Sequence, residues 1–219
     1  MSSNDSIRVW DLPVRLFHWS LVTFFTVAYL TSEDENIWHI YSGYAVLGLI
    51  AFRALWGFIG TKHARFADFL SSPAAVVAYL MGLATGNARH YPGHNPAGGW
   101  MIVALLASLL VISISGLKLY AIEEGKGLLA GNSYLIGEAQ ADAGDDDEKS
   151  EALARGTGRR LAEADKEAGE FWEELHEIST NVTLALIALH IAGVFVSGKL
   201  HRENLVKAMI TGVKRRTPG

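Results

Sequence analysis

The chain has 219 residues, of which 50% are hydrophobic and only 19% are charged. Ordinary soluble domains are less apolar and more charged, so this composition predicts a protein that lies in a lipid bilayer. The net charge of -4 provides no basic excess and argues against a nucleic-acid partner. Cysteine is absent, which excludes disulfides, iron–sulfur clusters and covalently attached haem. Any metal or redox cofactor would therefore depend on histidine.

Four apolar segments are expected to cross the membrane as helices, since about 20 helical residues span the hydrocarbon. A signal peptide is the alternative for the first segment, but no small-residue cleavage site follows it and another apolar segment begins at once. The sequence therefore predicts an all-α fold, an integral membrane four-helix bundle that forms one domain over residues 1–219. The four predicted spans are residues 14–32, 37–59, 99–119 and 175–198.

Two further segments lie between these spans. Residues 73–86 are apolar but too short to cross, which predicts an extra helix at the membrane interface. Residues 121–174 contain 15 acidic and 6 basic side chains and predict a long polar loop, partly helical before Phe171. An acidic run of this kind is most often a solvated loop. The functional alternative is that it steers a basic redox partner.

The distribution of Lys and Arg near the spans predicts the orientation. Basic residues gather at the N-terminus, between the second and third spans, and at the C-terminus. The connection after the first span carries Glu33, Asp34 and Glu35 without Lys or Arg. We therefore expect both termini in the cytoplasm and the acidic loop outside.

Four histidines fall at membrane depth, where an ionisable side chain is costly and indicates a functional site. His18 and His190 are expected near the inner face, and His39 and His176 near the outer face. His176 and His190 are 14 positions apart in the sequence, roughly 21 Å along one helix face. Planar haem takes axial imidazoles from opposite sides, so the two depth-matched pairs predict two noncovalent b-type haems. Zinc would need further ligands nearby.

A single histidine does not by itself indicate a cofactor. Each membrane histidine, taken alone, is as easily a hydrogen-bonding group between helices. His201 is a rival ligand but lies among charges beyond the apolar run, so it is interpreted as interfacial. His63 and His90 are expected to be solvated loop residues. Gly43 and Gly193 follow the ligand positions closely and could lie against the haem.

Several segments together have the pattern of one family. They read VWDLPVRLFHW, FRALWGFIGTKHARFADF, GHNPAGGWM, and LHEISTNVTLALIALH followed by HRENLVKAMITG. The chain resembles the bacterial cytochrome b561 and nickel-iron hydrogenase cytochrome b family over all four spans. The resemblance implies a di-haem membrane cytochrome b that passes electrons between quinone and a partner, with His18, His39, His176 and His190 as axial ligands of the haem irons. The long acidic loop departs from shorter members of that family.

Two other residues are candidate cofactor-binding groups. Arg53, near the cytoplasmic end of the second span, is expected either to reach lipid phosphates or to pair with a haem propionate. His94, beside Asn95, is a candidate hydrogen-bond partner of a quinone carbonyl, although a turn at Pro96 explains much of this motif. The tryptophans lie near span ends and predict an aromatic belt: Trp10, Trp19, Trp38, Trp56, Trp100 and Trp172.

These features together predict a transmembrane di-haem cytochrome in the bacterial inner membrane. It would exchange electrons between membrane quinone and an outer redox protein such as a c-type cytochrome or a dehydrogenase. One alternative is superoxide oxidation coupled to quinone reduction, but an acidic outer loop does not attract an anionic substrate. Another is a haem-free transporter or interaction subunit, which would be colourless when purified.

Overall fold

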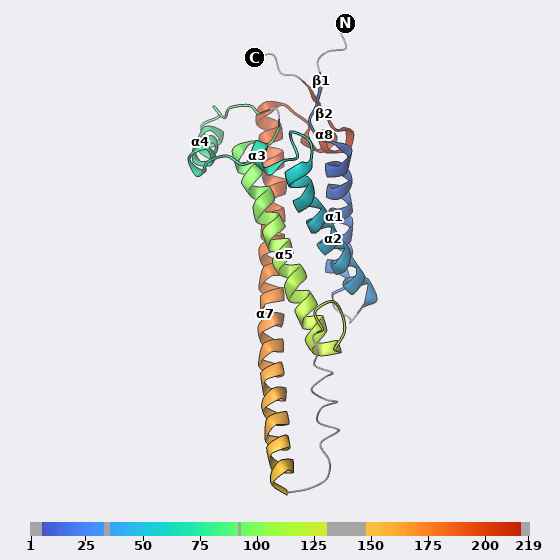
Figure 1. Ribbon diagram of the computed structural model, residues 1–219. Helices are drawn as coiled ribbons and strands as arrows, with labels where there is room; N and C mark the ends of the chain where they lie inside the picture. Colours follow the sequence, from blue (N-terminus) through green and yellow to red (C-terminus); the bar gives the residue numbers. More distant parts are fainter. Residues whose placement is uncertain (1–5, 33–35, 92, 131–147, 216–219) are drawn as a thin grey trace. The chain divides into compact units, whose positions relative to one another are not determined.

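The computed structural model describes residues 6–32, 36–91, 93–130 and 148–215, and helices dominate it (Figure 1). The predicted all-α class is therefore confirmed. The elements, in chain order, are β1 (Ser6–Arg8), α1 (Leu12–Leu30), α2 (Ile37–Ile59), α3 (Phe66–Phe69), α4 (Pro73–Ala84), α5 (Pro96–Glu124), α7 (Glu148–His201), α8 (Leu205–Thr211) and β2 (Val213–Arg215).

The chain divides into two compact units. The first contains residues 1–110 and 182–219, and the second contains residues 111–181. Helices α5 and α7 each contribute to both units. The first unit holds His18, His39 and His190, whereas His176 belongs to the second, so each is described with its own neighbours.

Among the described residues, three helices are long and apolar enough to cross a membrane: α2, α5 and the part of α7 from Glu163 to His201. They correspond to the second, third and fourth predicted spans. Helix α1 has 19 residues but does not reach the same hydropathy, because it includes the polar residues Arg15 and His18. A crossing by α1 remains a prediction.

Helix α7 begins much earlier than the fourth predicted span. Its 54 residues start at Glu148, so the expectation of helix before Phe171 is confirmed, and this helix runs on into the fourth predicted span without a break. Ala, Glu, Lys, Arg and Leu are strong helix formers, and the exposed pair Lys166–Glu170, at 3.7 Å, follows the helical i,i+4 spacing. Residues 131–147 of the predicted loop lie outside the described residues.

The helix starts follow from local capping chemistry. The side chain of Asp11 accepts a hydrogen bond from the Val14 amide at 2.9 Å, and Asn36 accepts one from Trp38 at 3.1 Å. Ser72 caps α4 in the same way. Each of these side chains satisfies an amide that the first helical turn leaves without a partner.

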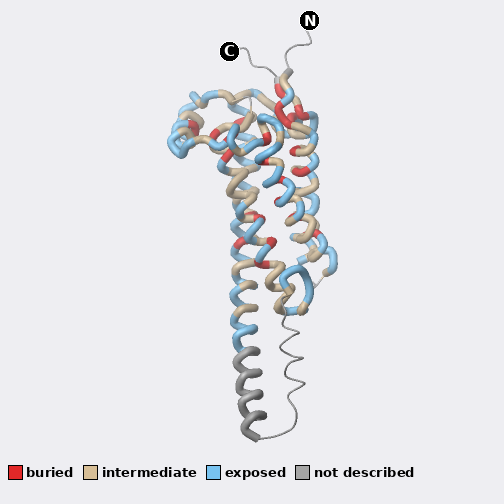
Figure 2. Tube along the Cα trace, in the orientation of Figure 1, coloured by how far each residue is buried: buried red, intermediate tan, exposed pale blue. Residues whose placement is uncertain are grey.

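The buried core of the first unit is small (Figure 2). Val46 and Ile50 of α2 pack with Leu109 of α5, and Leu21 and Phe25 of α1 pack against them. Most other apolar side chains of these helices remain partly or fully exposed. This is expected of helices that meet lipid, where van der Waals packing replaces the hydrophobic effect as the force that associates helices.

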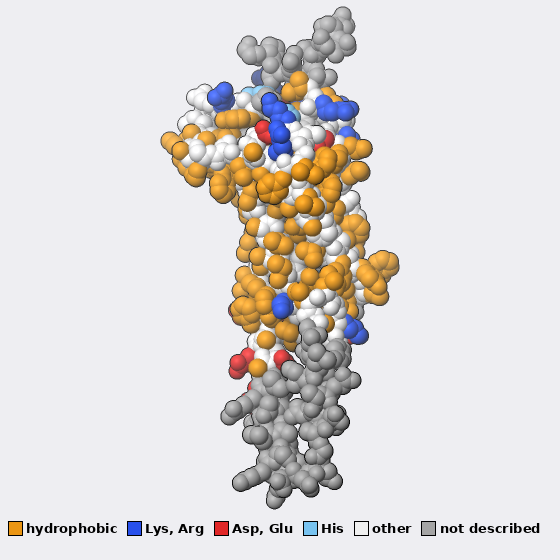
Figure 3. All heavy atoms as spheres, in the orientation of Figure 1, with side chains coloured by type: hydrophobic (Ala, Val, Ile, Leu, Met, Phe, Trp, Pro, Cys, Tyr) orange, Lys and Arg blue, Asp and Glu red, His pale blue; other side chains and the backbone are white. Residues whose placement is uncertain are grey.

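Figure 3 shows hydrophobic side chains over the sides of the helices in the first unit. Lys and Arg side chains gather at the end of this unit that carries α8 and β2. A short apolar helix, α4, occupies the segment for which an interfacial helix is predicted, and its place at the membrane interface remains a prediction. Its Tyr79 is buried, with its hydroxyl 3.5 Å from Ser197 Oγ on α7. Val77, Leu80 and Met81 stay exposed.

A terminal strand pair was not expected from the sequence. β1 and β2 pair antiparallel, with Ser6 opposite Arg215 and Arg8 opposite Val213. The amides of Val9 and Trp10 then donate to the carbonyl of Gly212, at 2.9 and 3.2 Å. The two ends of the described chain are thereby tied together.

Candidate functional site

The predicted inner pair comes together in the first unit. His18 on α1 and His190 on α7 lie within electrostatic range of each other, and both are partly buried. The Nδ1 atom of His18 is buried and has no hydrogen-bond partner among the described residues. A buried imidazole nitrogen that makes no hydrogen bond destabilises the fold, unless a bound group beside it interacts with that nitrogen.

Open space lies beside two glycines near the proposed ligands, Gly43 after His39 and Gly193 after His190. A Cβ atom added to Gly43 on α2 or to Gly193 on α7 would meet no atom within 4 Å. By contrast, a Cβ on Gly57 of α2 would collide with the Phe66 ring. The glycines selected from the sequence therefore leave room beside the helix backbones, and the residues fit a flat macrocycle such as haem b.

His39 is oriented by the neighbouring helix. Its Nδ1 lies 2.8 Å from the carbonyl oxygen of Ala28 on α1. A carbonyl can only accept, so the proton lies on Nδ1 and the lone pair on Nε2. A hydrogen bond of this kind, at the nitrogen that faces away from the metal, is the usual way in which a metal-binding imidazole is held.

His176 has a comparable environment in the second unit. Its Nδ1 is 3.0 Å from Ser115 Oγ and 3.2 Å from the carbonyl of Ile112, both on α5. The imidazole lies so close to Gly116 that an added Cβ would be 3.0 Å from its Cε1 atom. The sequence analysis did not select Ser115 or Gly116. The only signal was two adjacent small residues within an apolar span.

Arg53 is buried, with 2% of its surface exposed. The expectation that it reaches lipid phosphates at the surface is therefore wrong. Its guanidinium lies over the rings of Phe66 and Phe69, 5.2 and 5.7 Å from their centroids. Its Nη1 has no hydrogen-bond partner within the described part of the chain, which leaves a buried cation able to bind an anion.

The carboxylate of Asp11 accepts its hydrogen bonds from residues other than Arg53. One oxygen caps α1, while Oδ2 accepts from Trp56 Nε1 at 2.9 Å and from Thr61 Oγ1 at 2.7 Å. Asp11 is within electrostatic range of Arg53. Its hydrogen bonds connect the start of α1 to the end of α2.

His94 is packed between two aromatic side chains of the first unit. Its ring centroid lies 4.4 Å from that of Trp10 and 4.8 Å from that of Phe69. Burial, followed by the charges of Arg53 and Lys214, lowers the pKa of His94 to about 3. The imidazole is therefore neutral at physiological pH. Its buried Nδ1 has no partner among the described residues.

A cavity of about 180 Å³ adjoins His94, lined by Lys62, His63, Asp68, Phe69, Tyr91, Gly93 and His94. His63 lies against Gly93, where an added Cβ would be 2.9 Å from its Nδ1. His63 is therefore a partly exposed turn residue that also lines this cavity. Asp68 forms an ion pair with Arg65 at 2.7 Å.

Asn95 has a structural role at the start of α5. Its Oδ1 accepts a hydrogen bond from the Gly98 amide at 2.7 Å, and Pro96 occupies the first helical position. This is an N-cap followed by proline. The turn therefore explains Asn95, and His94 remains the candidate ligand-binding residue of this motif.

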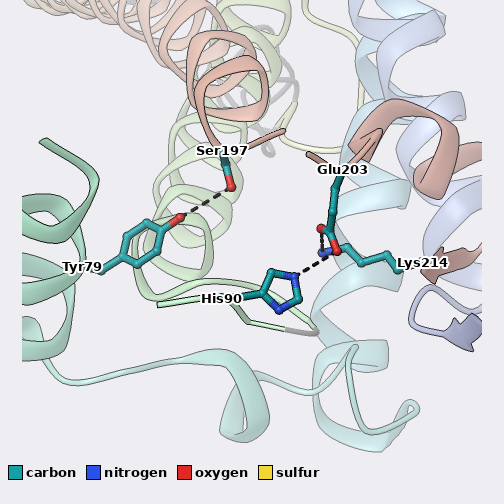
Figure 4. A network of polar contacts seen from close by, with 5 residues as sticks. All are labelled: Tyr79, His90, Ser197, Glu203 and Lys214. Atoms are coloured by element: carbon teal, nitrogen blue, oxygen red, sulfur yellow. Dashed lines mark hydrogen bonds and ion pairs between the residues drawn. The ribbon is translucent and has the colours of Figure 1, made fainter. Parts of the chain in front are cut away.

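His90 belongs to a polar network in the first unit (Figure 4). Its Nε2 is 2.9 Å from Glu203 Oε1, and Lys214 Nζ is 3.1 Å from Glu203 Oε2. The expectation of a solvated His90 is therefore wrong. Burial alone would raise the pKa of Glu203, but the His90 hydrogen bond and the Lys214 charge lower it overall.

The tryptophans fit the predicted aromatic belt only in part. Trp19, Trp38 and Trp100 are exposed, as belt residues should be. Trp10 is only 7% exposed, so the belt interpretation is wrong for it. Trp56 is partly buried and donates to Asp11.

A bare metal ion and haem need different numbers of protein ligands. Among the residues that the structure describes, no group of three or more His, Asp or Glu side chains is placed to hold a metal. Haem iron needs only two protein ligands, since the macrocycle supplies the others.

Comparison with protein families gave a match to the family described as prokaryotic cytochrome b561, over residues 9–212. No curated protein and no solved structure matched the chain. The family match covers nearly all of the described helices, including the three that can cross a membrane. The chain therefore belongs to the prokaryotic cytochrome b561 family, which makes it a membrane protein of haem b electron transfer.

Proposed function

We propose that this protein is a di-haem b-type cytochrome that transfers electrons between membrane quinone and a redox partner on the outer face. The observation that carries the proposal is that His18 on α1 and His190 on α7, both partly buried, lie within electrostatic range of each other. Haem iron changes between two oxidation states and so supplies one-electron transfer. The protein's part is to hold, orient and insulate the two groups.

The inner haem would be ligated by His18 and His190. The unpartnered, buried Nδ1 of His18 and the open space at Gly193, three residues after His190 on α7, support this assignment. Arg53 would bind a propionate of the same haem. A buried guanidinium with an unused donor is costly, and a carboxylate offsets that cost best.

The outer haem would be ligated by His39 and His176. Each has Nδ1 next to a backbone carbonyl, which leaves the lone pair of Nε2 as the one directed to iron. Their pairing rests on their matched depth in the sequence. The local hydrogen bonds support each residue separately as a ligand.

Quinone would bind at the cavity beside His94. A neutral imidazole has one N–H that can donate to a quinone carbonyl, and the lowered pKa of His94 keeps it neutral. His63, Asp68 and Lys62 also line this cavity and provide exchangeable protons. Quinone reduction consumes protons, so polar groups at the site suit that reaction.

The distribution of charged residues along the chain supports an orientation in the membrane and a class of redox partner. The basic N- and C-terminal segments support cytoplasmic termini in a bacterial inner membrane. The exposed acidic residues at the start of the described α7 surface support an outer partner of positive charge, such as a c-type cytochrome, with a dehydrogenase as the other candidate.

The test is a reduced-minus-oxidised visible spectrum of the purified chain together with haem counted per polypeptide. Two b-type haems, both removed by acid acetone, are expected because the chain has no cysteine. One haem per chain would refute the di-haem assignment. A colourless protein that stays colourless after haem is supplied would support the haem-free alternative.

A further inference from the structure

We propose that Trp10 is a positioning residue of the inner quinone site and that the terminal strand pair holds it in place. The inference rests on the proposed quinone function of His94. Trp10 acts on His94 and does not itself line the cavity, whose walls come from residues 62–94.

The first step is what orients His94. Hydrogen bonds at the ring nitrogens usually fix an imidazole, but Nδ1 of His94 has none within the described chain. Ring packing takes that role instead. Trp10 lies 4.4 Å away with an interplanar angle of 55°, and Phe69 lies 4.8 Å away at 49°. Such tilted contacts are favourable for aromatic pairs.

The second step is what orients Trp10. Its amide donates to the carbonyl of Gly212 at 3.2 Å, and the Val9 amide donates to the same oxygen at 2.9 Å. The indole is buried with Val9 and Ala208 of α8. The C-terminal segment therefore fixes both the backbone and the side chain of Trp10.

The third step is why position 212 requires glycine. Its φ of +82° is left-handed, a conformation that favours glycine. An added Cβ would also lie 2.7 Å from the carbonyl oxygen of Trp10. A side chain at position 212 therefore requires a shift at the Trp10 carbonyl or at residue 212 itself. We expect a shift of Trp10 to reach His94, although Gly212 is remote from the cavity in the sequence.

The chain offers a matched control for the backbone effect. Gly86 also has a left-handed φ, +75°, but an added Cβ there meets no atom within 4 Å. Gly86→Ala imposes the same kind of strain without the collision. Trp10→Phe is the conservative control, because it keeps an aromatic ring against His94.

Two readouts on the full chain in lipid nanodiscs test the inference. The first is modification of His94 by diethylpyrocarbonate, followed by peptide mass spectrometry, which measures how well the ring is packed. The second is the Kd of the quinone-site inhibitor 2-heptyl-4-hydroxyquinoline N-oxide, measured from quenching of its own fluorescence. Haem content and circular dichroism check that each variant folds.

Trp10→Leu and Gly212→Ala should both raise the modification rate of His94 and weaken inhibitor binding by roughly fivefold to tenfold. Trp10→Phe and Gly86→Ala should stay near wild type in both readouts. Unchanged His94 modification in folded Trp10→Leu and Gly212→Ala proteins would overturn the inference.

A further variant separates this inference from the proposed function. If His94→Ala binds the inhibitor as wild type does, the quinone assignment is wrong. Faster modification of His94 in Trp10→Leu would even then support Trp10 as the residue that holds this imidazole. If His94→Ala loses binding while Trp10→Leu keeps it, Trp10 is not a positioning residue for quinone.

Discussion

Nδ1 of His39 lies 2.8 Å from the carbonyl oxygen of Ala28, on the helix that precedes it. The same helix, α1, carries His18. Helix α1 therefore supplies one proposed ligand and orients another. A shift of α1 along α2 would disturb both proposed haem sites. The capping of α1 by Asp11 and the strand pair that precedes it oppose such a shift.

The proposed ligand pairs predict which haem each variant loses. His18→Ala and His190→Ala should remove the same inner haem, while His39→Ala and His176→Ala should remove the outer one. Each variant should retain about one haem per chain, since a haem b site needs both imidazoles. Redox titration of each protein identifies the component that disappears.

His201→Ala is the control for these variants, because His201 lies beyond the apolar part of α7 and should not ligate iron. It should keep both haems. Loss of the same component from His18→Ala and His176→Ala would show that the pairing is wrong.

Ser115→Ala should loosen the outer haem. The substitution removes one of the two groups next to Nδ1 of His176 and leaves the Ile112 carbonyl. Loss of a hydrogen-bond partner behind a metal-binding imidazole typically weakens metal binding at least about tenfold. Competition with apomyoglobin for haem measures the change. Ser113→Ala, another buried serine of α5, is the matched control, and an equal effect from it would contradict a specific role for Ser115.

The proposed histidine ligands and the glycines near them could be selected from the sequence, because hydropathy and spacing report depth and helix face. Arg53 was also identified, although its burial was not. Trp10, Ser115 and the Gly212 contact could not be found in this way. Their roles depend on contacts between residues far apart in the chain, for which helical periodicity carries no signal.

The fold shows the same limit. Helices α2, α4 and α5 follow from apolar segments flanked by capping residues. Only part of the polar start of α7 was expected to be helical, because its Ala- and Glu-rich stretch is polar and hydropathy does not separate a polar helix from a loop. Strands β1 and β2 have three residues each, too few to show an alternating pattern.

Arg53→Gln should lower the midpoint potential of the inner haem. A buried positive charge favours the more negative, reduced state, so its removal favours oxidation. We expect a fall of roughly 60 mV, which corresponds to tenfold in the equilibrium constant for one electron. Spectroelectrochemical titration measures it. Arg65→Gln, at an exposed position, should leave the potential unchanged, and an equal fall there would indicate a general surface effect.

Glu203→Gln should destabilise the protein at neutral pH and much less at low pH. The buried pair with Lys214 is broken, which costs about 3 kcal/mol. The folded-state pKa of Glu203 is lowered from 4.5. Its contribution is therefore complete above 4.5 and is lost as the pH falls through the lower folded value. Thermal unfolding at several pH values should show that the difference in Tm between the variant and wild type becomes smaller as the pH falls.

Exposed Glu170 provides the control for this pH dependence, since Glu170→Gln should change Tm little at any pH. A Tm difference for Glu203→Gln that stays constant from neutral to acid pH would contradict a charged role for this carboxylate.

Neutralising acidic residues on α7 should slow electron exchange with a basic c-type cytochrome. Glu167, Glu173 and Glu174 are exposed, and exposed charges act mainly on the association rate, with screening over about 8 Å at physiological salt. The triple Gln variant should therefore react more slowly in stopped flow at low ionic strength and equally fast at high salt. Ferricyanide, an anion, should respond in the opposite direction. If the rates with the cytochrome change neither with the substitutions nor with ionic strength, this surface is not its docking site.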